Sequence, residues 1–229
     1  PVSKPYIDMT VDVMGQFDVG VYSDGYDRFT VEGGQIYRSG KYSVEPDSSQ
    51  AGYFWSAAAI TGSTVQVMGL KDDSRQGDVH FAETLGRMGC VLKKQDNGIA
   101  VTGGQLSGIE VDMEDMPDMV PTLAIVAAFA EGTTVIKNVA HLKAKECDRI
   151  DAVIRELAKL GVEAEWTSTD LVIKGGWSHG AEIDTYNDHR IAMSFAIAGL
   201  KIPGIAIRNE SCVEKSFPEF WQVFKRMYL

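Results

Sequence analysis

The sequence predicts an α/β protein built from three βαβαββ-like units. Three aspartates that each open an apolar, alanine-rich helix recur 71 and 70 residues apart, at Asp47, Asp118 and Asp188. Double glycines recur 70 and 72 residues apart, at residues 33–34, 103–104 and 175–176. Self-similarity at a fixed period is typical of a fold assembled from repeated supersecondary units.

The first 43 residues contain only the second half of such a unit. A helix is expected over residues 7–16, and two strands at 19–22 and 28–31 flank a polar turn. Residues 1–43 are therefore predicted to be the C-terminal portion of another domain, with a hinge near residues 43–45. Because the chain begins at Pro1, halfway through a unit, it is expected to be truncated upstream.

Residues 44–229 are predicted to form one domain of three units. In each unit one helix is apolar nearly all round, whereas the other is amphipathic. We expect the alanine-rich helices to be buried together, with the sheets and the amphipathic helices outside. The alanine-rich helices are expected at 47–60, 117–130 and 189–200, the amphipathic ones at 78–88 and 150–160, and the strands at 64–67, 91–92, 99–101, 133–136, 162–166, 171–173 and 205–207.

The composition of the chain excludes some classes of binding partner. The net charge of -10 argues against a general nucleic-acid surface or an anionic membrane surface as partner, since either requires a broad basic face. The three cysteines are an odd number without zinc-type spacing, which favours free thiols in a reducing compartment, here the cytoplasm. No metal and no cofactor is expected.

Cations recur where helices are expected to begin. Lys71, Lys145 and Lys215 lie 74 and 70 residues apart, each at the expected start of a second helix, and Arg149 and Arg190 also lie at helix starts. A cation is normally unfavourable at a helix N-terminus, where the macrodipole already carries positive charge. The pattern predicts bound anions at these positions.

The segment Lys145-Glu-Cys-Asp-Arg149 carries two cations four residues apart, with Glu146 beside them. A general acid or base flanked by cations that hold a phosphorylated ligand would need this composition. The alternative is a solvated helix start with internal ion pairs.

Two of the aspartates can also be explained without a catalytic role. Asp118 and Asp188 are helix N-caps by default, although a carboxylate held among cations can also take a proton from a hydroxyl group. His189 and Arg190 follow Asp188 in a first turn suited to phosphate or carboxylate.

Six motifs in the same order resemble the 5-enolpyruvylshikimate-3-phosphate synthase family. They are Ser3-Lys-Pro-Tyr6, Val44-Glu-Pro-Asp-Ser-Ser49, Met116-Pro-Asp118, Lys145-Glu-Cys-Asp-Arg149, Asn187-Asp-His-Arg190 and Lys215-Ser-Phe-Pro218. The resemblance covers the whole chain but only the C-terminal half of that enzyme. It implies an inverse α/β barrel of two domains with the active site between them, one domain being complete here and the other partial.

The resemblance also implies a reaction and roles for individual residues. The family transfers the enolpyruvyl group of phosphoenolpyruvate to the 5-hydroxyl of shikimate 3-phosphate and releases phosphate. Asp118 matches the base and Glu146 the residue that protonates the methylene carbon. The implied phosphoenolpyruvate contacts are Arg149, His189, Arg190 and Lys215, and the implied shikimate 3-phosphate contacts are Ser3, Tyr6, Asp118, His141 and Lys145.

Two departures and one gap separate this chain from the family pattern. His141 replaces a usual asparagine and Cys147 a small hydroxyl residue. The first half of the enzyme, with a catalytic lysine and further arginines, is absent, so this chain is expected to need the N-terminal half as a separate chain or fragment. The alternatives are a non-catalytic anion-binding fragment and a transferase acting on UDP-N-acetylglucosamine.

Overall fold

The structure, a computed structural model, describes residues 2–176 and 179–228 and confirms the repeated α/β unit. The chain ends Pro1 and Leu229, which bound the two expected domains, lie outside the described residues. The second unit consists in order of β6 (Glu110–Asp112), α4 (Val120–Ala128), β7 (Thr133–Lys137), α5 (Arg149–Lys159), β8 (Glu163–Trp166) and β9 (Leu171–Lys174). Its sheet has the order β6-β7-β9-β8, in which β6 and β7 are parallel and the other neighbours antiparallel.

The other two units repeat parts of this pattern. The first contains α2 (Ser48–Thr61), β3 (Thr64–Met68), the 3-10 turn η1 (Gly77–His80), α3 (Phe81–Arg87), β4 (Val91–Gln95) and β5 (Gly98–Thr102). The third contains β10 (Glu182–Ile183), α6 (His189–Ala198), β11 (Ala206–Ile207), η4 (Glu210–Lys215), α7 (Phe220–Phe224) and η5 (Lys225–Tyr228). The order β3-β5-β4 matches β7-β9-β8, and the parallel pair β10-β11 matches β6-β7. Within the described residues, the first unit has no opening strand and the third no closing hairpin.

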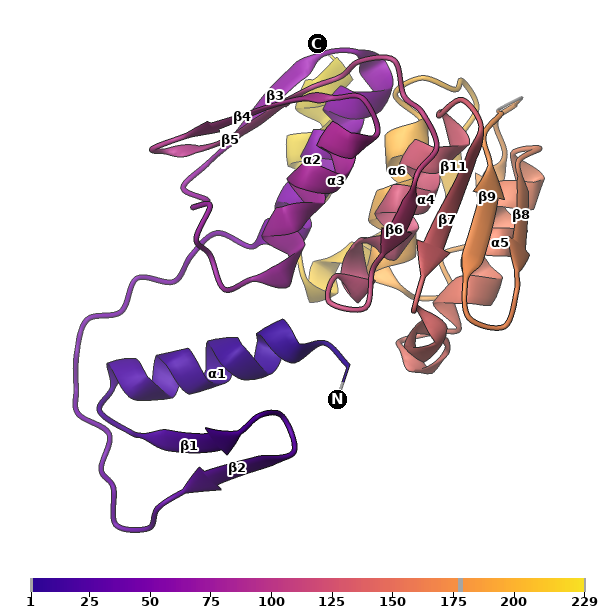
Figure 1. Cartoon of the computed structure of the whole chain (residues 1–229). Helices are drawn as coiled ribbons and strands as arrows, with labels where there is room; N and C mark the ends of the chain where they lie inside the picture. Colours follow the sequence, from indigo (N-terminus) through magenta and orange to yellow (C-terminus); the bar gives the residue numbers. More distant parts are fainter. Residues whose placement is uncertain (1, 177–178, 229) are drawn as a thin grey trace.

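The alanine-rich helices α2, α4 and α6 contact one another, as predicted. Every residue of α4 is buried, because small side chains let helix backbones approach closely while larger ones fill the remaining space. Trp55, Phe81 and Phe195 are fully buried, and Phe54 is partly buried against the same core. Figure 1 shows the sheets on the outside of these helices.

In the second and third double glycines, the first glycine packs directly against the backbone at the end of a buried helix. A Cβ atom on Gly103 would lie 2.3 Å from the carbonyl oxygen of Ala58, near the end of α2. A Cβ atom on Gly175 would lie 1.7 Å from the carbonyl oxygen of Ala130, just after α4. Glycine at these positions lets the chain after a hairpin cross the end of a buried helix.

The expected helix over residues 117–130 is divided in the structure. Residues Pro117–Met119 form the 3-10 turn η2, and α4 begins only at Val120. Pro121 has no N–H to donate to the carbonyl of Pro117, so a regular α-helix cannot begin at residue 117. The helix expected over 78–88 likewise begins with the 3-10 turn η1, and η3 (Ala140–Ala144) precedes α5.

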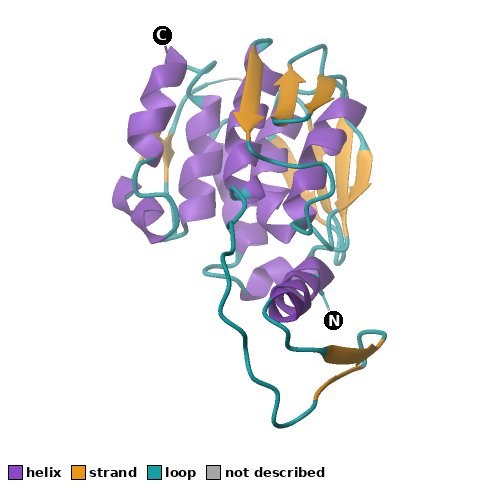
Figure 2. Cartoon of the chain, turned by 90° about the vertical axis from the view of Figure 1, so that its left-hand side faces the viewer, coloured by secondary structure: helices purple, strands orange, loops and turns teal. Residues whose placement is uncertain are grey.

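The N-terminal segment forms a separate lobe beside the repeats (Figures 1 and 2) and contacts them through its helix. It contains α1 (Lys4–Gln16), which has no buried residue, and the antiparallel hairpin of β1 (Val21–Asp24) and β2 (Arg28–Val31). The first strand begins two residues later than expected, whereas the second has the expected limits. The boundary at residues 43–44 stays a prediction. No helix in the described part of the chain is long and apolar enough to span a bilayer.

Candidate active site

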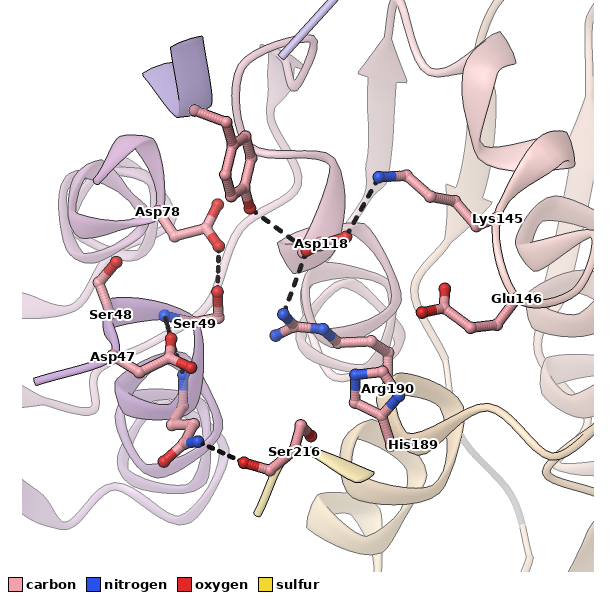
Figure 3. Close-up of polar contacts among 12 residues, drawn as sticks. Asp47, Ser48, Ser49, Asp78, Asp118, Lys145, Glu146, His189, Arg190 and Ser216 are labelled. Atoms are coloured by element: carbon pink, nitrogen blue, oxygen red, sulfur yellow. Dashed lines mark hydrogen bonds and ion pairs between the residues drawn. The ribbon is translucent and has the colours of Figure 1, made fainter. Parts of the chain in front are cut away.

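Charged side chains from several elements meet around Asp118. Its carboxylate lies 2.8 Å from Arg149 Nη1, 3.1 Å from Arg190 Nη2 and 3.6 Å from Lys145 Nζ. The Tyr6 hydroxyl donates a hydrogen bond to it over 3.3 Å. Figure 3 shows Asp118 between Lys145 and Arg190. The structure thus brings together residues that are 112 positions apart in sequence.

Asp118 does not cap a helix, contrary to its default interpretation. It lies within η2, and neither η2 nor α4 has a side-chain cap, the residue before α4 being Met119. Burial alone would raise the pKa of Asp118, but Arg190, Arg149 and Lys145 outweigh it and lower that pKa to about 2. The carboxylate is therefore ionised at neutral pH.

Arg149 joins three carboxylates at the start of α5. Its Nε donates to Asp188 over 2.7 Å, its Nη1 to Asp118 over 2.8 Å and its Nη2 to Glu146 over 2.7 Å. The residue is 1% exposed. A planar guanidinium with five N–H donors is suited to such multiple contacts, which fix the three carboxylates relative to one another.

Asp188 caps α6, as predicted, and is fully buried. It accepts a hydrogen bond from the backbone N–H of Arg190 over 2.8 Å and thereby sets the start of the helix. His189 is buried too, and its Nδ1 has no hydrogen-bond partner among the described residues. Burial and the neighbouring Arg190 lower the pKa of His189, which favours the neutral imidazole.

Glu146 is held by two cations at the edge of this cluster. It lies 2.7 Å from Arg149 and 2.8 Å from Lys215, whose side chain is 60% exposed. Burial would raise the pKa of Glu146, but the Lys215 hydrogen bond and Arg149 prevail and lower it to about 2. Glu146 is therefore ionised in the absence of substrates.

The structure corrects the electrostatic expectation for the lysines. Lys145 follows η3, Lys215 ends η4, and Lys71 lies in a loop before η1, so none of them begins a helix. Cations are favourable at helix C-termini. Of the five cations named in the sequence pattern, Arg149 and Arg190 alone lie in first turns. Carboxylates of the chain itself pair with both. The internal ion pairs of the alternative interpretation are therefore present.

Two residues expected to contact shikimate 3-phosphate make no side-chain hydrogen bond to the cluster around Asp118 in the described part of the chain. The backbone carbonyl of Ser3 accepts from the Tyr6 N–H, but no hydrogen bond joins its side chain to the cluster within the described residues. The buried Nε2 of His141 has no partner there either. Burial and Lys145 lower the pKa of His141, so its imidazole is a neutral neighbour of the cluster.

Cys147 preserves a donor function where the family pattern has a hydroxyl group. Its Sγ lies 3.6 Å from Asp188 Oδ2, and burial followed by Asp188 raises the pKa of the thiol to about 12. The thiol therefore stays protonated and donates to Asp188. Cys90 and Cys212 are also free thiols, and no group of three or more His, Cys, Asp or Glu side chains in the described chain is arranged to hold a metal ion.

A neighbouring cavity contains residues that sequence reasoning missed. It has a volume of about 250 Å³ and reaches Asp118 and Arg190. The Ser49 hydroxyl donates to the buried carboxyl of Asp78, as Figure 3 shows. Ser49 belongs to a motif quoted for the resemblance, but Asp78 appeared only as a helix start. The other lining residues are Tyr6, Met9, Asp47, Ser48, Gln76 and Gly77.

Asp78→Asn is expected to change how stability depends on pH. Burial raises the pKa of Asp78 to about 6, above the value near 4 of an exposed aspartate. Its contribution to stability is therefore fully present below about pH 4 and lost as the pH rises through about 6. The unfolding free energy of the variant relative to wild type should rise by about 2–3 kcal/mol between about pH 4 and pH 7. Urea unfolding of both proteins at each pH measures this difference in unfolding free energy. A difference that stays constant between about pH 4 and pH 7 would contradict the raised pKa of Asp78.

Comparison with known proteins identifies the family. The family model described as EPSP synthase (3-phosphoshikimate 1-carboxyvinyltransferase) matches residues 1–224. A 3-phosphoshikimate 1-carboxyvinyltransferase of Nostoc punctiforme is 46% identical over 99% of this chain and 53% of its own length. An EPSP synthase structure from Acinetobacter baumannii has a TM-score of 0.82 and 31% identity, covering 93% of this chain and 53% of that one.

A more distant structure agrees in fold. The enolpyruvyl transferase NikO from Streptomyces tendae has a TM-score of 0.77 at 18% identity, over 97% of this chain and 53% of its own. These structural neighbours confirm the predicted inverse α/β barrel architecture. The chain spans about half the length of the relatives it matches. From the family match over residues 1–224 and the identity to its relatives, the chain belongs to the EPSP synthase family.

Proposed function

We propose that the chain is the C-terminal half of an enolpyruvyl transferase that acts on phosphoenolpyruvate and shikimate 3-phosphate. The observation that carries the proposal is the cluster of Asp118 and Glu146 among Arg149, Arg190 and Lys215, in a chain of this family. Both substrates are anions, and preorganised cationic donors are the usual means of stabilising charge that develops in a transition state.

The arrangement supports a division of binding roles. Arg149, His189, Arg190 and Lys215 would hold phosphoenolpyruvate. Arg190 Nε is buried without a partner among the described residues, and Lys215 is largely exposed, so both retain donors for an incoming anion. Shikimate 3-phosphate would contact the other side of the cluster, at Ser3, Tyr6, Asp118, His141 and Lys145.

The chemistry follows from the two carboxylates. Asp118 takes the proton of the 5-hydroxyl as that oxygen attacks C2 of phosphoenolpyruvate, and Glu146 delivers a proton to the methylene carbon. The resulting tetrahedral intermediate then loses a proton from its methyl group and releases phosphate, which restores the double bond. Since Glu146 has a pKa of about 2 here, the proposal requires substrate anions to draw Lys215 and Arg149 away and so raise that pKa.

The proposal includes a partner, the N-terminal half of the same kind of enzyme. Several apolar side chains of residues 2–43 are exposed to solvent, among them Tyr22 at 71% and Ile36 at 81%. In the second unit β7 pairs with β9, but β11 pairs only with β10 within the described residues. Exposed apolar side chains and open strand edges favour association. A cytoplasmic location belongs to the same proposal.

Complementation tests the proposal. The chain is mixed with the N-terminal half of the Nostoc punctiforme relative, and phosphate release is followed with both substrates. We expect release only when both halves and both substrates are present. The controls are each half alone and the mixture without shikimate 3-phosphate.

The other outcomes separate the alternatives. A stable complex that binds substrate without turnover would support a non-catalytic anion-binding fragment. Turnover with UDP-N-acetylglucosamine in place of shikimate 3-phosphate would support the sugar-nucleotide transferase. A complex that binds neither substrate would contradict all three functions.

A further inference from the structure

We propose that Glu156 and Tyr186 are positioning residues, because the hydrogen bond between them holds the turn that sets Asp188, Arg149 and Arg190 in place. Neither residue belongs to the anion cluster. The inference rests on the proposed function for its kinetic consequence, but its structural consequence can be measured without any activity.

The turn before Asp188 has an unfavourable backbone. Tyr186 and Asn187 have φ values of 53° and 57°, so two consecutive non-glycine residues adopt the left-handed conformation. A bulky residue such as tyrosine rarely does so, and such geometry persists only where surrounding contacts impose it. Two contacts supply part of this restraint. The Asp188 N–H donates to the Thr185 carbonyl within the turn over 2.8 Å, and Asn209, from a later segment, donates to the Asn187 side chain over 3.1 Å.

The remaining restraint comes from a buried carboxylate on α5. Glu156 is fully buried. The Tyr186 hydroxyl donates to it over 2.7 Å and the Asp184 N–H over 3.0 Å, while Lys159 lies 2.7 Å away. A buried charge needs such partners. Of these three contacts with Glu156, the tyrosine bond is the one made by a left-handed residue of the turn.

Helix α5 thus holds residues 184–188 at two points. Arg149, in its first turn, binds Asp188, and Glu156, seven residues later, binds Asp184 and Tyr186. Seven residues correspond to about two helical turns, which brings both side chains to one face of α5. The strained turn is therefore restrained by Glu156 as well as by Arg149.

The consequence for the active site passes through Asp188. This residue orients Arg149 by its carboxylate and begins the helix that carries Arg190. If the turn relaxes, both arginines lose a fixed partner. Displacement of about 1 Å at a binding group is enough to weaken a preorganised site.

The structural test uses Tyr186→Phe in the 229-residue chain, which removes only the hydroxyl group. We expect amide hydrogen exchange at Asp188 and Arg190 to accelerate about tenfold. Tyr22→Phe is the matched control, since it removes the same hydroxyl group from a residue that is 71% exposed on the β1-β2 hairpin, and it should leave this exchange unchanged. Unchanged exchange in Tyr186→Phe would overturn the proposal whatever the chain's activity.

The kinetic test uses the chain completed by an N-terminal half. The Michaelis constant for phosphoenolpyruvate should rise about tenfold in Tyr186→Phe, with kcat within about threefold of wild type. Glu156→Gln keeps one acceptor oxygen but turns its amide N–H₂ toward either the Tyr186 hydroxyl or the Asp184 N–H, both of which are donors. It should therefore raise the Michaelis constant at least as much as Tyr186→Phe does. The double variant should raise it by less than the product of the two single effects. An inactive wild type would count against the proposed function alone. An active wild type whose Michaelis constant is unaffected by Tyr186→Phe, or strictly multiplicative effects, would overturn the inference.

Discussion

Asp188→Asn is expected to destabilise the chain by about 3–5 kcal/mol. Asp188 is fully buried, and its two oxygens accept from Arg149 over 2.7 and 3.3 Å and from the start of α6 over 2.8 Å. The amide of asparagine carries no charge, so the buried guanidinium loses its fully buried counter-ion and keeps the partly exposed Asp118 and Glu146. Removing one partner of a buried ion pair is costly because the other charge stays desolvated.

Urea unfolding at neutral pH measures this loss. Glu163→Gln is a suitable control, because Glu163 and Lys174 pair over 3.2 Å on the β8-β9 hairpin through side chains that are 77% and 66% exposed. The control should change stability by less than about 1 kcal/mol. Equal effects of the two substitutions would show that Asp188 is not part of a buried ionic network.

Glu146→Gln in the completed enzyme is expected to lower kcat by about 10²- to 10⁴-fold. Glutamine has nearly the same shape and can still accept from Lys215, which lies 2.8 Å from Glu146 in this structure, but it cannot deliver a proton to carbon. Binding of phosphoenolpyruvate should therefore change little. The comparison of kcat with the dissociation constant separates loss of proton transfer from loss of binding.

Glu110→Gln provides the control for Glu146, since Glu110 pairs with Lys137 through side chains that are 65% and 38% exposed, and neither is a predicted site residue. We expect wild-type turnover from that variant. Near-normal turnover in Glu146→Gln would remove Glu146 from the role of proton donor.

Much of the fold could be predicted from local patterns. Helix α5 was expected over residues 150–160 and spans 149–159, because Ile150, Val153 and Leu157 repeat at helical spacing and are buried. Asp47 was expected to open α2, and its side chain accepts from the N–H groups of Ser49 and Gln50. Strands β6 and β10, of three and two residues, received no predicted limits, and two residues of the strand expected at 205–207 form β11. Segments so short carry little periodicity.

Local sequence patterns predicted only part of the candidate site. The motifs identified Asp118, Glu146, Arg149 and Arg190, and the structure joins them by hydrogen bonds or ion pairs. They did not identify Asp78, Glu156 or Tyr186, whose roles depend on contacts 28 to 30 residues away in sequence. Burial and partner identity are properties of the packed chain, so spacing within one segment does not encode them.

Sequence alone was enough to predict the repeated α/β unit, because helix periodicity, capping and turn chemistry act over a few residues, and its six motifs carried the resemblance to the family. It misjudged why the cations are tolerated. The packed structure gives carboxylate partners to Lys145, Arg149, Arg190 and Lys215, most of them from another segment, with Arg149 between Asp118, Glu146 and Asp188. Coulomb energy depends on distance and on the surrounding dielectric, and both arise only when the helices and turns pack together.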